Sequence, residues 1–177
     1  SVFIRTRNKQ TTKAISVPAI MDATAPVKTI IGNIRKGIIR MAKFKTVFLG
    51  GTCNESVWRD NLQDMLHPNI AAFNPVVSDW DEAAYHKELY ARRHSDYLLY
   101  TLTPKMTGVY SVAEVVDDSN KNPKKTILCV LREDGDYEFT YGQLKSLEAL
   151  CKMIVLNGSI AFSSLEDVAL YLNSKVV

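Results

Sequence analysis

The stretch that decides the fold is Lys45-Thr-Val-Phe-Leu-Gly-Gly-Thr-Cys-Asn-Glu-Ser56. A short apolar run leads into two glycines and small polar residues, and the amphipathic run 57–66 follows. Strand, Gly-Gly turn and helix in this order are typical of the first βα unit of a nucleotide-handling α/β domain, where glycines allow close backbone approach and the helix N-terminus offers free N–H groups. The pattern is not GxGxxG, so it does not imply a dinucleotide. A purely structural turn is the alternative.

From Lys45 onward, the chain alternates between apolar and amphipathic segments, which predicts parallel strands joined by crossover helices. We expect strands near residues 46–49, 70–73, 97–102, 126–131 and 153–156, and helices near 56–66, 82–93, 109–118, 141–150 and 165–173. This predicts an α/β fold, a flavodoxin- or Rossmann-like three-layer sandwich with a five-stranded parallel sheet of order 2-1-3-4-5 and helices on both faces. Residues 132–138 are interpreted as a solvated loop.

Charge divides the chain into two parts. Residues 1–45 hold ten Lys or Arg and one Asp, a net charge of +9, whereas the whole chain carries +3 and the remainder −6. Apolar residues between positions 27 and 41 follow helical spacing, although two glycines weaken a helix there. We therefore predict a basic N-terminal extension over 1–44 and an α/β domain over 45–177. The extension could dock on nucleic acid, another anionic partner or a larger assembly.

Composition excludes several classes of protein. The three cysteines are an odd number without a CxxC pair, so neither a disulfide framework nor a zinc site is indicated, and a reducing, cytoplasmic environment is expected. The three histidines lack metal-ligand spacing, and no apolar run is long enough to span a bilayer. We expect no metal, no cofactor and no transmembrane segment, and we expect the chain to form a homo-oligomer.

A second stretch, Gly108-Val-Tyr-Ser-Val-Ala-Glu114, places a carboxylate just inside a helix that begins at the carboxyl end of a predicted buried strand. Ligands of open parallel sheets bind at that edge, and a carboxylate held there can attack a sugar carbon. Glu114 is therefore the candidate nucleophile. The alternative is that it only complements the helix dipole.

These two stretches, with Phe73-Asn-Pro-Val-Val-Ser-Asp-Trp-Asp81 after the second strand and Ser95-Asp96 before the third, resemble the nucleoside 2-deoxyribosyltransferase-like family. That family includes the 2'-deoxynucleoside 5'-phosphate N-hydrolases. The resemblance covers residues 45 to about 157. It implies that a glutamate attacks C1' of deoxyribose, that the base leaves, and that another base or water resolves the glycosyl-enzyme. Glu114 matches the position of that nucleophile.

The resemblance also implies a second acid, because cleavage through an oxocarbenium-like state needs one ionised carboxylate near C1' and one protonated acid near the leaving group. Glu88 lies nearest the matching place, and Asp79 and Asp81 compete for the role. Asp96 matches a recurrent aspartate before the third strand, or serves only as a cap or turn residue. Gly108 stands where the transferases often carry an aspartate, which favours hydrolysis over base exchange.

Substrate contacts are expected from the same stretches. The sugar or phosphate edge would be lined by Gly50, Gly51, Thr52 and Asn54. Asp79 and Gly108 are also expected to bind substrate. Ser111 and the helix N-terminus could hold a 5'-phosphate. Trp80 and Tyr110 could stack on a base, although aromatic side chains more often pack in a core.

The expected function is cleavage or transfer at the N-glycosidic bond of deoxynucleosides or their 5'-monophosphates. A non-catalytic binding or structural module that docks through the basic extension is the alternative from another class. A flavodoxin-like FMN binder is disfavoured because no Ser/Thr-rich phosphate loop follows the first strand.

Overall fold

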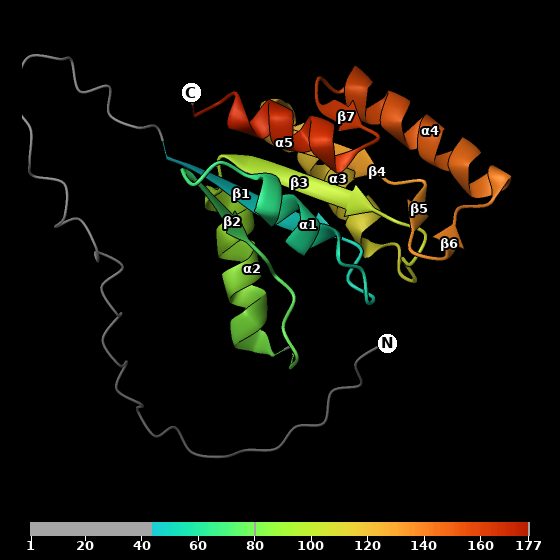
Figure 1. Cartoon of the computed structure of the whole chain (residues 1–177). Helices are drawn as coiled ribbons and strands as arrows, with labels where there is room; N and C mark the ends of the chain where they lie inside the picture. Colours follow the sequence, from blue (N-terminus) through green and yellow to red (C-terminus); the bar gives the residue numbers. More distant parts are fainter. Residues whose placement is uncertain (1–43, 80, 177) are drawn as a thin grey trace, which may run out of the picture. The chain divides into compact units, whose positions relative to one another are not determined.

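The computed structural model describes residues 44–79 and 81–176 (Figure 1). The basic extension, apart from Phe44, and the predicted base-stacking residue Trp80 lie outside the described residues. The boundary between extension and domain therefore stays a prediction. Among the helices of the described part, none has both the length and the apolar character that crossing a membrane requires.

A parallel sheet of five strands forms the centre of the domain, in the order β2-β1-β3-β4-β7 (Figure 1). The strands are β1 (Lys45–Gly51), β2 (Ile70–Phe73), β3 (Tyr97–Leu102), β4 (Thr126–Val130) and β7 (Ile160–Phe162). The predicted strand order is confirmed. Because β2 lies on one side of β1 and all later strands lie on the other, the winding direction reverses between β1 and β3, where such sheets bind ligands.

Side-chain alternation in the strands divides the core into two layers. In β1, Val47 and Leu49 face a cluster formed with α1 (Trp58–Met65) and α5 (Leu165–Asn173). Phe48 faces the opposite cluster, which includes residues of α2 (Glu82–His94), α3 (Tyr110–Lys121) and α4 (Tyr141–Leu156). Helices thus cover both faces of the sheet, and the predicted three-layer α/β fold is confirmed.

The fifth strand is not where the sequence predicts it. Residues 153–156 form the last turn of α4, and the strand is β7, whose Ile160 pairs with Ile127 of β4. The helix continues because Leu147, Leu150 and Ile154 recur at helical spacing and are buried in one cluster. The chain leaves the helix only at Gly158, whose φ of 96° suits glycine.

The predicted solvated loop at 132–138 is instead an antiparallel hairpin, β5 (Glu133–Asp134) with β6 (Tyr137–Glu138). The Asp134 side chain is only 8% exposed. It forms an ion pair with Lys105 Nζ at 3.3 Å and accepts a hydrogen bond from Ser56 Oγ. The hairpin is therefore tied to the loops that follow β1 and β3. A short 3-10 helix, η1 (Pro123–Lys125), precedes β4.

Candidate active site

The loop after β1 is held against the end of β3 by its backbone. Gly51 has a φ of 117°, and a Cβ atom there would lie 2.1 Å from the carbonyl oxygen of Thr101. Thr52 then donates its N–H to the same carbonyl at 2.9 Å and accepts the N–H of Thr103 on Oγ1 at 2.9 Å. Gly51 and Thr52 therefore fix the backbone that follows β1 against the end of β3, through contacts within the protein.

A cleft opens next to this backbone segment, at the carboxyl ends of β1 and β3. It consists of two hollows that share Gly51, Cys53, Tyr110 and Ser111. The first, of about 330 Å³, is also lined by Gly50, Arg59, Glu88 and Glu114 and by residues 75–77. The second, of about 240 Å³, is also lined by Thr52, Asn54, Thr107 and Gly108, among others. The sequence-predicted nucleophile and second acid thus face one hollow.

A larger hollow of about 600 Å³ lies elsewhere, between β2 and α2. Its walls include Phe73, Tyr90 and His94 but none of the acidic side chains of the described residues. Acid–base chemistry on a sugar needs carboxyl groups, so the cleft at the strand ends is the better candidate although it is smaller.

Glu114 is the fifth residue of α3 and is only 6% exposed. Burial raises the pKa of its carboxyl group to about 7, because a charge is poorly solvated there. The nearby Arg92 cation acts in the opposite direction, while the carboxylates of Glu88 and Asp118 raise the pKa further. An acidic residue that merely complements a helix dipole is expected in the exposed first turn, and Glu114 is neither exposed nor in that turn.

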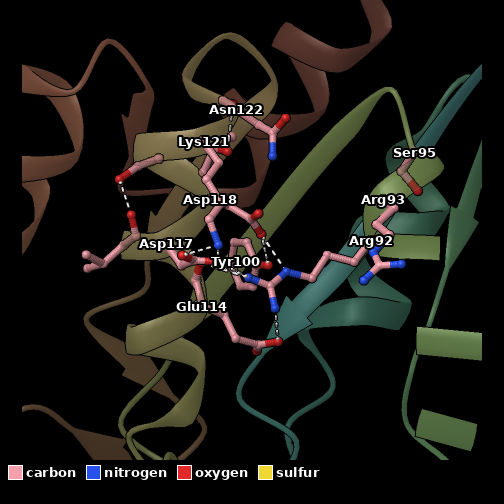
Figure 2. Close-up of polar contacts among 12 residues, drawn as sticks. Arg92, Arg93, Ser95, Tyr100, Glu114, Asp117, Asp118, Lys121 and Asn122 are labelled. Carbon is pink, nitrogen blue, oxygen red and sulfur yellow. Dashed lines mark hydrogen bonds and ion pairs between the residues drawn. The ribbon is translucent and has the colours of Figure 1, made fainter. Parts of the chain in front are cut away.

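Arg92, on α2, is the residue that the sequence does not reveal. Its Nη1 donates to Glu114 Oε1 at 3.0 Å and its Nε donates to Asp118 Oδ2 at 2.6 Å, as Figure 2 shows. The Tyr100 hydroxyl donates to the same Asp118 oxygen at 2.5 Å. Burial lowers the pKa of Arg92, but the hydrogen bond to Asp118 and the surrounding charges raise it overall, so the guanidinium stays charged.

Arg59, on α1, is a second residue without a sequence signal. It is 4% exposed and donates to the carbonyls of Leu49 at 3.0 Å and Thr52 at 2.7 Å. Burial lowers its pKa. Arg59 therefore locks the turn after β1 and brings a cation to the same hollow as Glu114.

The predicted contact residues other than Asp79 and Trp80 line the cleft. Asn54 connects the loop after β1 to the loop after β3, because its side-chain amide donates to the Lys105 carbonyl at 3.0 Å and to Thr107 Oγ1 at 2.7 Å. Tyr110 is 65% exposed at the start of α3, so it belongs to the cleft and not to a core. Gly108 has open space where a side chain would extend.

Three acidic candidates are not brought into the cleft. Asp96 precedes β3, at the amino end of the sheet, where it binds Lys45 Nζ at 2.8 Å and the Thr46 N–H at 2.9 Å. Asp81 caps α2 by accepting the Ala84 N–H at 2.7 Å. Asp79 is exposed on the loop after β2 and is not among the residues that line either hollow.

Comparison with protein families supports the geometry. The profile of the family described as nucleoside 2-deoxyribosyltransferase like matches residues 44–133, which is just over half of the chain and spans every strand and helix that borders the cleft. The chain therefore belongs to the nucleoside 2-deoxyribosyltransferase-like family, as the resemblance implies. Comparison with curated proteins and with solved structures gives no match.

Proposed function

We propose that this protein cleaves the N-glycosidic bond of 2'-deoxynucleosides or their 5'-monophosphates through a covalent glycosyl-enzyme on Glu114. The observation that carries the proposal is a buried carboxylate that lines a cleft at the winding reversal of the sheet, with a second carboxyl group in the same cleft. The family to which the chain belongs supports a nucleoside substrate.

In the proposed reaction, a carboxylate oxygen of Glu114 forms a bond to C1' while the bond from C1' to the base nitrogen breaks. The electron pair of that bond leaves with the base, and Glu88 donates the proton that neutralises it. Water then attacks C1', gives its proton to Glu88 and releases Glu114 as a carboxylate. A second base in place of water gives transfer instead of hydrolysis.

Glu88 suits the acid role because it is half-buried on α2 and its charge acts on Glu114. It also lines the same hollow as Glu114, so both carboxyl groups can reach one substrate. One acid and one carboxylate in a shared hollow is the arrangement that glycoside cleavage requires.

Hydrolysis is proposed over base exchange because Gly108 occupies the position where the family's transferases often carry an aspartate. The second hollow, which Gly108 lines together with Asn54 and Ser111, is proposed to hold the sugar and any 5'-phosphate. Ser111 lies in the first turn of α3, where backbone N–H groups favour an anion.

The test is base release from a panel of deoxynucleosides and deoxynucleoside monophosphates. Glu114→Gln should lower kcat by at least about a hundredfold, because it removes the nucleophile and keeps the shape. Glu88→Gln should lower kcat less for a base that leaves without protonation than for a base that needs a proton to leave. Glu82→Gln is the matched control, since Glu82 is an exposed glutamate on the same helix, and it should retain wild-type activity. A Glu114→Gln variant with more than about a tenth of wild-type kcat would contradict the assignment.

Trapping tests the covalent step separately. A nucleoside with fluorine at C2' destabilises the oxocarbenium-like state of both steps, so the glycosyl-enzyme should accumulate when the leaving base is good. Peptide mass spectrometry should then find the sugar on the peptide that contains Glu114. An adduct on another residue would refute the proposed nucleophile even if base release is observed.

A further inference from the structure

The guanidinium of Arg92 joins two helices through opposite edges. Nη1 contacts Glu114 Oε1 at 3.0 Å, and Nη2 contacts the Glu114 carbonyl at 3.3 Å. On its other edge, Nε contacts Asp118 Oδ2 at 2.6 Å. Glu114 and Asp118 are one helical turn apart on α3, so Arg92 fits between their side chains as Figure 2 shows.

Asp118, which accepts the Nε–H of Arg92, is itself held by a residue of the sheet. The hydroxyl of Tyr100, a fully buried residue of β3, donates to Asp118 Oδ2 at 2.5 Å. Asp118 is 5% exposed, so this oxygen receives two donors in a place that excludes most water. A chain of contacts thus runs from a rigid strand through Asp118 and Arg92 to Glu114.

We propose that Arg92 is a positioning residue for Glu114, which it aligns through one carboxylate oxygen, and that Asp118 and Tyr100 hold Arg92 in place. The inference rests on the proposed function, because it assumes that Glu114 acts on a substrate. Arg92 contacts Oε1, and the contact does not use Oε2, so one oxygen is anchored while the other can face the sugar.

A purely structural role accounts poorly for this arrangement. A buried ion pair loses much of its attraction to the removal of both charges from water, so it contributes little net stability compared with apolar packing. The half-exposed Asp117 lies 3.5 Å from Arg92 but binds Lys121 more closely, at 2.7 Å. Arg92 therefore serves two buried carboxylates, Glu114 and Asp118, and such a perturbed cluster in a cleft favours a functional role.

The charge on Glu114 depends on every ionisable group near it. Those groups are Cys53 on the loop after β1, Arg59 on α1, Glu88 and Arg92 on α2, Tyr100 on β3, and Tyr110, Asp117 and Asp118 on α3. Arg92 is the one that lowers the pKa of Glu114, against burial and the two carboxylates. Removal of Arg92 should therefore move the pKa of Glu114 upward.

The deciding experiment measures the pKa of Glu114 directly, from the NMR shift of its side-chain carboxyl carbon, in the full chain. Arg92→Met should raise that pKa by about one pH unit or more, and Arg92→Lys, which keeps the charge, should raise it less. Arg93→Met is the matched control, because Arg93 is the exposed neighbour on the same helix, and it should leave the pKa unchanged. If Arg92→Met unfolds, Arg92→Gln, which removes the charge but keeps side-chain N–H donors for Asp118, serves in its place.

The kinetic arm tests alignment. In Arg92→Met, kcat at a pH that fully ionises Glu114 should still fall by about tenfold to a hundredfold with KM little changed, and Arg92→Lys should recover part of the loss. The inference is overturned if Arg92→Met matches Arg93→Met in both the pKa of Glu114 and kcat. If the wild-type protein releases no base from any substrate, the proposed function fails by itself, and the NMR titration alone then decides whether Arg92 controls Glu114.

Discussion

Replacement of Glu114 by glutamine should make the protein more stable at alkaline pH. The folded-state pKa of about 7 lies above the ordinary value of 4.5 because burial disfavours the charged form. A carboxyl group with a raised pKa contributes stability below the pKa of the unfolded chain, and that contribution is lost as the pH rises through the folded-state pKa. At 1.36 kcal/mol for each pH unit, the difference amounts to about 3 kcal/mol above neutrality. Glutamine has the same shape and never ionises, so the variant should keep what the wild-type protein loses.

The assay is urea unfolding of wild type and Glu114→Gln at about pH 5 and about pH 8, with Glu82→Gln as the exposed control. The stability of Glu114→Gln relative to wild type should rise by about 2–3 kcal/mol between the two pH values, while that of Glu82→Gln should stay constant. The competing effect is the ion pair with Arg92 at 3.0 Å. If that pair outweighed burial, Glu114→Gln would be less stable at high pH, and a flat or falling difference would refute the reasoning.

The remaining predictions concern activity and the floor of the cleft. For base release, kcat/KM should rise as the pH rises through about 7, because the nucleophile must be ionised. A kcat/KM that falls through the same pKa would make Glu114 the acid instead. The Gly108→Asp side chain has open space, and the substitution should raise the ratio of base exchange to hydrolysis when a second free base is added. An unchanged ratio would show that Gly108 does not favour hydrolysis. Gly51→Ala should destabilise the fold by at least about 2 kcal/mol in urea unfolding, since its Cβ would meet Thr101, while Gly142→Ala on α4, where nothing lies nearby, should not destabilise it.

The sequence predicts the sheet well because its strands carry two independent signals. Buried runs such as 97–102 and 126–130 are mostly apolar, with one threonine each, and turn residues or amphipathic helices bound them. The fifth strand fails this rule. Ile160 belongs to a strand of three residues, too short for a periodic signal, while the apolar residues 153–156 that precede it complete a helix.

The site is predictable in part for the same reason. Glu114 can be found because the order of strand, loop and helix places it at the carboxyl edge of the sheet. Asp96 could have been excluded by that rule, since a residue that precedes a parallel strand lies at the opposite edge. Arg92 could not be found, because it stands beside Arg93 and only the packing of α2 on α3 decides which of the two turns inward.

Helix α2 buries none of its thirteen residues fully, although it carries both Glu88 and Arg92. Its Arg92 packs on the carboxyl group of Glu114, which ionises above about pH 7 and is then better solvated when α2 opens, so a rising pH weakens the attachment without changing the apolar sheet core. The wall of the cleft that holds the proposed acid is therefore expected to behave as a separate cooperative unit, with a lower opening free energy than β3. Amide hydrogen exchange should show α2 opening earlier than the sheet as the pH rises through about 7, which would make substrate entry a local unfolding event of one helix.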